Sequence, residues 1–168
     1  AYLLIYGRLP NAAELEQWEY DITHHALLNE EMRSFFDAFP RRAHPMAVLA
    51  SATNAISTFY DVYRRPIRAA EIDAGARTLI AKLPTVAAWA YKKSIGEPAV
   101  YPHRSYTYCE NFLNMMFSSP VREYAPDKES VRLLNMLFIM HADHEQNCST
   151  SAVRLVGSSQ ANLYASIA

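Results

Sequence analysis

The sequence predicts an all-α protein on the strength of three observations. Apolar residues recur at intervals of three and four along most of the chain, which is the spacing of one face of an α-helix. Only four glycines occur in 168 residues, and this scarcity argues against a fold rich in tight β-turns. No segment alternates apolar and polar residues convincingly with the period of two that is typical of a half-buried strand. We therefore expect helices joined by short, Pro-marked turns within one packed unit over residues 1–168.

The first clear helix is predicted to begin after Asn11. Asn11 and Glu14 have the three-residue spacing of a capping box. Apolar and aromatic residues then follow at helical intervals, and the second short helix is expected over about residues 30–39, before Pro40. The stripe of the first helix consists of Leu15, Trp18, Ile22 and His25.

The next helix is predicted to start at Pro45, because proline is favoured at the first helical position. Its apolar stripe consists of Leu49, Ala52, Ile56, Phe59 and Tyr63.

A further stripe precedes Pro84, where we expect the helix to break, since proline lacks the N–H that an interior helical position requires. Thr85 is then expected to begin a separate helix that ends near Gly96. Two more helices are predicted over residues 105–117 and about 127–141. The stripe before the break consists of Ile72, Ala76, Leu79 and Leu83.

Composition excludes several classes of function. The formal net charge is −1 and no basic stripe is present, so nucleic acid is not an expected partner. The uninterrupted apolar runs are far shorter than the ~20 residues that a membrane-spanning helix needs. Cys109 and Cys148 form no CxxC pair, which favours a reducing cytoplasm or organelle matrix, and of these we expect the cytoplasm. The neighbouring Lys92 and Lys93 are expected on a hydrated surface.

The segment "FIMHADHEQNCSTSAVRLVGSS", residues 138–159, contains the chemically suggestive residues. His141 and His144 share a helical face if the helix continues through them. Three interpretations are open: histidines at the edge of the core that bond to backbone groups, a metal site, or an anion site. A metal site is disfavoured because no further Cys or His completes a ligand set and the HExxH order is absent.

An anion site has several features in its favour. Histidines near the C-terminal end of a helix are stabilised in their charged form by the helix dipole. Asn147 adds an amide donor, and the run Ser149, Thr150 and Ser151 is expected to cap the next helix, whose free N–H groups suit a carboxylate.

Several blocks of the chain resemble one known family. "HADHEQNCSTS" and the following "VRLVGSSQANLYASIA" are similar to the bacterial type of citrate synthase, and "YLLIYGRLP", "HPMAVLASA", "KLPTVAAWAYKKSIGEP" and "ENFLNMMFS" match it in the same order. The resemblance extends over essentially the whole chain. It implies a mostly helical fold and the condensation of oxaloacetate with acetyl-CoA to give citrate and free CoA. A 2-methylcitrate synthase that uses propionyl-CoA is the nearest alternative, and a non-catalytic helical module that binds a ligand or partner is an alternative of another class.

The resemblance also implies that this chain is an internal part of the large domain of such an enzyme. The family has a segment before "AYLLIY" and, after "ASIA", the motifs Gly-Pro-x-His-Gly-Gly and Gly-Phe-Gly-His-Arg. The general acid and base are therefore expected downstream of Ala168, and no catalytic residue is assigned within this chain. Family members form homodimers or hexamers, so a homo-oligomer is expected.

The resemblance assigns substrate-binding roles to three residues. The second histidine of the motif, His144, and the nearby Asn147 are expected to contact oxaloacetate, whereas His141 is expected to orient His144. Arg154 is expected either to support the same loop as a cation or to be solvated or paired. No metal ion and no prosthetic group is expected, and acetyl-CoA is the co-substrate.

Hexameric bacterial members also have an allosteric NADH site. His25, Tyr60, Arg77 and Lys82 match its positions, whereas His24 replaces an arginine and Val121 stands where a reactive cysteine can occur. NADH is therefore a possible allosteric inhibitor. The alternative is structural: Tyr60 would lie in the core, and Arg77 and Lys82 would be hydrated surface charges.

Overall fold

A computed structural model describes residues 1–60 and 68–168, and all its regular elements within these ranges are helical. No strand is found there, and a single bridge joins Ser119 and Arg122. The predicted all-α class is confirmed, while Tyr63 of the predicted stripe lies outside the described residues. The helices are α1 (Tyr2–Tyr6), α2 (Ala12–His24), α3 (Met32–Asp37), α4 (Pro45–Ile56), the 3₁₀ helix η1 (Ser57–Phe59), α5 (Ala69–Ile95), α6 (Tyr108–Phe117), α7 (Lys128–Met140), α8 (Cys148–Ser158) and α9 (Leu163–Ile167).

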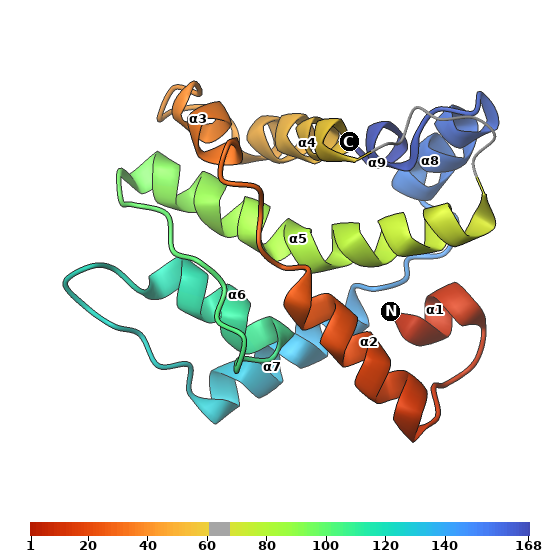
Figure 1. Ribbon diagram of the computed structural model, residues 1–168, viewed down its shortest axis with the longest axis horizontal. Helices are drawn as coiled ribbons and strands as arrows, with labels where there is room; N and C mark the ends of the chain where they lie inside the picture. The colour runs from red at the N-terminus through yellow and green to blue at the C-terminus, as the bar shows by residue number, and fades with distance from the viewer. Residues whose placement is uncertain (61–67) are drawn as a thin grey trace.

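Helix α5 lies in the middle of the molecule and separates two layers of helices. Figure 1 shows α3, α4 and α9 along one side of α5, and α2, α6 and α7 along the other. Helix α5 packs against members of both layers, whereas α7 packs on α6 and α8 packs on α9. Such a central helix must be apolar around most of its circumference. Its second half, residues 79–92, is accordingly buried at most positions.

The prediction that Pro84 breaks this helix is wrong, and so is the prediction that Thr85 begins a new one. Helix α5 runs without interruption from Ala69 to Ile95. Pro84 offers no N–H to the carbonyl of Ile80, but the Tyr108 hydroxyl of α6 donates to that oxygen at 3.1 Å. Because the tertiary contact satisfies the carbonyl that proline leaves unpaired, the helix continues.

The other predicted boundaries are mostly close to those observed. Asn11 and Glu14 form the predicted capping box, with the Glu14 N–H donating to Asn11 Oδ1 at 2.9 Å. Pro45 occupies the first turn of α4, and Gly96 ends α5 in the left-handed conformation. Helix α3 is shorter than predicted, and α6 begins at Tyr108 rather than at residue 105.

The core lies between α5 and the layer formed by α3, α4 and α9. Its centre includes the indole of Trp89, whose Nε1–H donates to the carbonyl of Val100 at 2.9 Å. Phe36 packs edge-on against this indole. The buried members of the cluster are Leu28, Met32, Phe36, Val48, Ala52, Ile56, Leu79, Val86, Trp89, Ala90 and Tyr164.

Lys92 is buried rather than hydrated, contrary to expectation. Only 1% of its surface is exposed, and its ammonium donates to Glu97 Oε2 and to the Ser118 carbonyl, both at 2.6 Å. A lysine is tolerated at such depth because each donation replaces a lost contact with water. Lys93, by contrast, remains partly exposed and donates to the carbonyl of Asp37 at 3.1 Å.

None of the helices in residues 1–60 and 68–168 combines the length and the apolar composition needed to cross a membrane.

Candidate functional site

The predicted substrate-binding residues lie in the connection between α7 and α8. Helix α7 ends at Met140 and His141 is its C-cap. The expectation that the helix continues and aligns both histidines on one face is therefore wrong, because His144 lies beyond the helix in an irregular segment. The turn nevertheless keeps the two rings near each other, with 5.7 Å between their centroids.

The His141 ring is hydrogen-bonded to its own helix, whereas the His144 ring has no such bond within the described residues. The Nδ1 atom of His141 lies 2.8 Å from the Leu137 carbonyl. Since a carbonyl oxygen can only accept, Nδ1 must carry the proton and Nε2 faces away from this bond. Among the described residues, the imidazole of His144 makes no hydrogen bond, and both histidines are solvent-exposed. His144 is thus free to donate to a ligand.

The backbone around His144 is shaped by its neighbours. The Glu145 N–H donates to Asp143 Oδ1 at 3.0 Å, so the aspartate side chain spans His144. Glu145 itself has a φ of 55°, in the left-handed region that non-glycine residues seldom occupy. Its carbonyl accepts from the N–H of Asn147 at 3.0 Å. These contacts form a compact turn with His144 near its centre.

Helix α8 is capped by Asn147, not by the hydroxyl run at residues 149–151 as predicted. The Thr150 N–H donates to Asn147 Oδ1 at 2.9 Å. The physical reason is that asparagine is at least as good an N-cap as serine, and it comes first along the chain. The cap occupies the carbonyl oxygen of the Asn147 side chain, which leaves its amide group as the donor for a ligand.

A cation on α8 reaches back to the same turn. Arg154 Nη1 donates to Gln146 Oε1 at 3.0 Å. Residue spacing alone gave no indication of Gln146, because no local periodicity links positions eight apart. In the part of the chain that the structure describes, no three His, Cys, Asp or Glu side chains gather closely enough to hold a metal ion.

Three of the four residues matched to the NADH site meet where the end of α2 crosses α5. Lys82 donates to the carbonyls of His25, at 2.9 Å, and Leu27. The lysine is 7% exposed, so its expected alternative as a hydrated surface charge is wrong. Burial lowers the pKa of Lys82 to about 8.

Arg77 pairs with Asp21 at 2.6 Å and with Asp73 at 2.7 Å, in partly buried positions. His25 Nδ1 donates to the Asp21 carbonyl at 2.7 Å. Tyr60 instead stacks on Tyr164 of α9 with ring centroids 5.7 Å apart, at the edge of the core. The cations of this set are therefore already engaged by groups of the chain itself.

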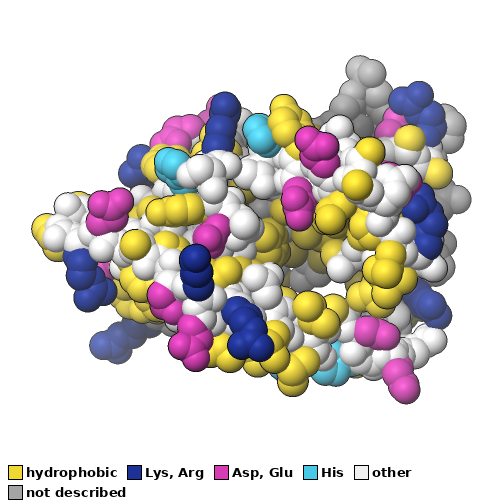
Figure 2. Space-filling model, turned by 90° about the horizontal axis from the view of Figure 1, so that it is seen from below, with side chains coloured by type: hydrophobic (Ala, Val, Ile, Leu, Met, Phe, Trp, Pro, Cys, Tyr) yellow, Lys and Arg dark blue, Asp and Glu magenta, His cyan; other side chains and the backbone are white. Residues whose placement is uncertain are grey.

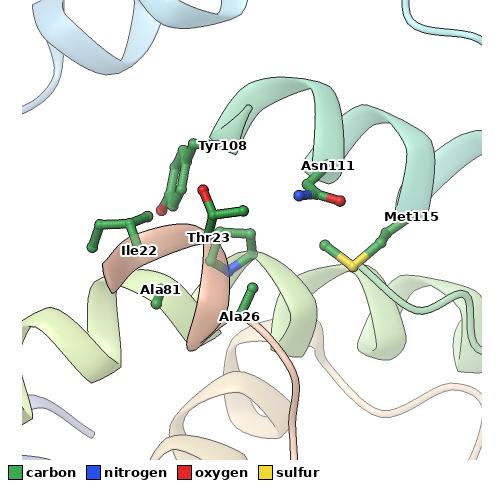
Figure 3. Close-up of a pocket in the computed structure, with 8 residues that line it drawn as sticks. Ile22, Thr23, Ala26, Ala81, Tyr108, Asn111 and Met115 are labelled. Atoms are coloured by element: carbon green, nitrogen blue, oxygen red, sulfur yellow. The ribbon is translucent and has the colours of Figure 1, made fainter. Parts of the chain in front are cut away.

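A small cavity lies where α2, α5 and α6 meet. Its volume of about 10 Å³ is close to what one water molecule requires, so no substrate fits there. Figure 3 shows Tyr108 and Asn111 of α6 over this space, with Thr23 of α2 beside them. Its lining comprises Ile22, Thr23, Ala26, Ala81, Pro84, Tyr108, Asn111 and Met115.

Helices α7 and α8 have no buried residue and expose much apolar surface. Ile139 of α7, for example, is 75% exposed. Figure 2 shows the face on which α2, α6 and α7 lie, with hydrophobic side chains exposed among charged ones. The large apolar side chains exposed on α7 and α8 are Leu133, Met136, Leu137, Phe138, Ile139, Met140, Leu155 and Val156.

Comparison with known proteins agrees with the resemblance noted in the sequence. The model of the family "Citrate synthase, C-terminal domain" matches residues 1–168. Citrate synthase 1 of Mycobacterium tuberculosis (strain H37Rv) is 54% identical over 166 residues, and Citrate synthase of Corynebacterium glutamicum is 49% identical over 168. These alignments cover 99% and 100% of this chain, which spans 38% of the length of each relative.

Solved structures give the same result. The crystal structure of citrate synthase from Pyrobaculum aerophilum superposes with a TM-score of 0.86 at 33% identity, covering 99% of this chain and 42% of that one. Citrate synthase from Thermotoga maritima superposes with a TM-score of 0.79 at 25% identity, covering 98% and 40%. The chain therefore belongs to the citrate synthase family.

Proposed function

We propose that the full-length protein containing this chain is a citrate synthase, which condenses acetyl-CoA with oxaloacetate and, as water cleaves the thioester, releases citrate and CoA. The single observation that supports this most strongly is the match over all 168 residues to relatives named citrate synthase at 49–54% identity. The same names favour acetyl-CoA over the propionyl-CoA of a 2-methylcitrate synthase. They also disfavour a non-catalytic helical module.

This chain contributes one wall of the oxaloacetate site in our proposal. His144 donates a hydrogen bond to the ketone oxygen of oxaloacetate, and the free amide group of Asn147 adds a second donor. Polarising the ketone makes its carbon a better acceptor for the enol formed from the acetyl methyl group, and stabilises the alkoxide that develops on its oxygen. His141 orients His144. The groups that move the methyl proton belong to residues downstream of Ala168.

The solvent exposure of both histidines suits a site that is completed by other residues of the full-length protein. A dianion with a ketone needs donors from several directions, and an open turn provides donors from one direction only. We expect the exposed apolar faces of α7 and α8 to be buried in the full-length protein, including by contacts with a second copy in a homo-oligomer. The cytoplasm remains our proposed location, which suits a chain whose two cysteines are unpaired.

NADH inhibition is a second, weaker proposal for the same protein. It rests on the gathering of His25, Arg77 and Lys82 at the crossing of α2 and α5. Because Asp21, Asp73 and two carbonyls already hold these cations, NADH would have to displace them. We therefore expect weak inhibition at most, measured by NADH titration of the full-length enzyme.

The decisive experiment compares His144→Ala and His141→Ala in the full-length protein. Loss of one charge-assisted hydrogen bond should lower kcat/KM for oxaloacetate by roughly 2–4 kcal/mol, about thirty- to a thousandfold, with a raised KM and a lowered kcat. His141→Ala should cost on the order of ten- to a hundredfold.

Two controls separate the alternatives. A chelator should leave the rate unchanged, whereas a metal site predicts activity lost to chelator and restored by a divalent ion. Thermal melts should stay close to wild type, whereas a purely structural role predicts a lowered melting temperature with normal kinetics. Unchanged oxaloacetate kinetics in His144→Ala would rule out the proposed role of this residue.

A further inference from the structure

We infer that Arg154 is a positioning residue for His144, acting through Gln146; this inference rests on the proposed function. Arg154 does not touch the imidazole. It donates from α8 to the side chain of Gln146, two residues after His144, at 3.0 Å. The bond joins the end of the turn to a helix, so the turn is fixed from outside as well as by its own hydrogen bonds.

The turn needs such a restraint because its internal contacts are few. Between the C-cap at His141 and the N-cap at Asn147, one side-chain bond from Glu145 N–H to Asp143 and one backbone bond from Asn147 N–H to Glu145 are found. Glu145 also occupies the left-handed region, where a residue with a Cβ is less favourable by about 1–2 kcal/mol. A different conformation of this turn would move His144.

Helix α8 connects the turn to the core through α9. It packs on α9, whose Tyr164 is buried in the core cluster. The chain of contacts therefore runs from the core through α9 and α8 to the Arg154 guanidinium, and from there to Gln146. An error of about 1 Å in the placement of a substrate-binding group can lower a rate by up to a hundredfold.

Within the described residues, Arg154 makes a hydrogen bond and no ion pair. No carboxylate within residues 1–60 and 68–168 pairs with this guanidinium, although several other arginines of the chain have acidic partners. Among the described residues, its polar contact is with the neutral amide of Gln146. The contact is directional, which is what positioning of a backbone segment requires.

A double-mutant cycle in the full-length enzyme tests the inference. Arg154→Met and Gln146→Leu should each lower kcat/KM for oxaloacetate on the order of tenfold, mainly through KM. The double variant should be no worse than either single variant, because both remove the same bond. Arg154→Lys, which keeps a donor and the charge, should recover part of the loss. Arg42→Met, at an exposed arginine on the α3–α4 connection, is the matched control and should leave the kinetics unchanged.

The background of His144→Ala provides the sharpest readout. If Arg154 acts through His144, adding Arg154→Met to that variant should change kcat/KM by less than about twofold, because the residue it positions is already gone. Independent tenfold effects in the two backgrounds would overturn the inference. So would a silent Gln146→Leu beside a damaging Arg154→Met, which would indicate that the charge acts on the substrate directly.

A second readout needs no enzymatic activity. In protein with labelled histidines, the His144 ring signals, assigned by their loss in His144→Ala, should shift or broaden in both Arg154→Met and Gln146→Leu while the melting temperature stays within a few degrees. Unchanged signals would overturn the inference whatever the reaction is. If wild-type protein releases no CoA from acetyl-CoA and oxaloacetate, the proposed function fails, and the ring signals still decide whether Arg154 positions His144.

Discussion

Two sets of helices in this molecule differ in burial: the buried set formed by α5 with α3, α4 and α9, and the exposed pair α7 and α8. Around α5, the helices α3, α4 and α9 bury a continuous cluster that includes Trp89 and Met32. Helices α7 and α8 bury no residue, although each has a well-formed N-cap, from Asp127 and from Asn147. Local sequence signals are therefore enough to form a helix in either set, whereas burial depends on what packs against the helix. The turn to which we assign oxaloacetate binding connects α7 and α8, where His144 stays exposed to solvent.

The largest expected effect on the free energy of unfolding concerns the buried set of helices, at Lys92 of α5. Lys92→Met in the full-length protein should lower the free energy of unfolding by about 2–4 kcal/mol, because the buried carbonyl of Ser118 loses its donor and Glu97 loses its cation. Lys93→Met is the matched control, and its more exposed contacts with Asp37 predict a loss below about 1 kcal/mol. Denaturant melts of both variants check this. Equal losses would show that burial does not distinguish these neighbouring lysines.

A smaller effect is expected where α6 supports the proline in α5. Tyr108→Phe should lower the free energy of unfolding by about 1–3 kcal/mol, since the Ile80 carbonyl loses its hydrogen bond. Pro84→Ala should rescue most of that loss, because an alanine N–H can donate to the same carbonyl within the helix. Thermal or denaturant melts of the two single variants and the double variant give the coupling. Additive losses would contradict our explanation of the unbroken helix.

A pH effect of about 1–2 kcal/mol on the free energy of unfolding is expected from Lys82. Its pKa is about 8 in the folded protein and near 10.4 in an unfolded chain. Between these values the unfolded state binds one more proton, so stability should rise as pH increases from about 7.5 to 9.5. Over this range the difference between the two pKa values corresponds to a gain of about 1–2 kcal/mol. The comparison with Lys82→Met isolates it, because Cys109 and the buried tyrosines titrate in both proteins; a pH-independent difference would contradict the assignment.

The sequence predicted the fold class because helical spacing and capping residues are local signals. The same locality explains two failures. Pro84 was expected to end a helix. The Tyr108 hydroxyl that satisfies the Ile80 carbonyl comes from far along the chain, so no local signal indicates this contact. Lys92 was expected in water, since its partners Glu97 and Ser118 meet only in the folded structure. For the candidate site, the resemblance indicated His144 and Asn147. The end of α7 at Met140 and the contact between Arg154 and Gln146 could not be predicted, because they depend on a turn whose sequence has no periodic pattern.

The smallest expected effect compares two of the left-handed residues, Gly96 at the end of α5 and Glu145 in the turn between α7 and α8. Gly96 ends α5 with a φ of 77°, and a Cβ added there would lie 2.5 Å from Nη2 of Arg41. At the end of α5, glycine thus occupies the left-handed position, and the neighbouring atoms belong to the flexible end of an exposed arginine side chain. Glu145 has a φ of 55° but possesses a Cβ, and its side chain is exposed.

Glu145→Gly should therefore change the free energy of unfolding by less than about 1 kcal/mol, because relief of the left-handed conformation is offset by the greater freedom of glycine in the unfolded chain. The variant keeps the N–H that donates to Asp143, so the oxaloacetate KM of the full-length enzyme should stay within about twofold of wild type. Glu145→Val should raise that KM, because a β-branched residue disfavours a positive φ and would shift the turn that contains His144. Steady-state kinetics and melts of both variants distinguish backbone conformation from side-chain chemistry. If Glu145→Gly raises the oxaloacetate KM as much as Glu145→Val does, the carboxylate of Glu145 must contribute to binding, and local backbone geometry would not be what places His144.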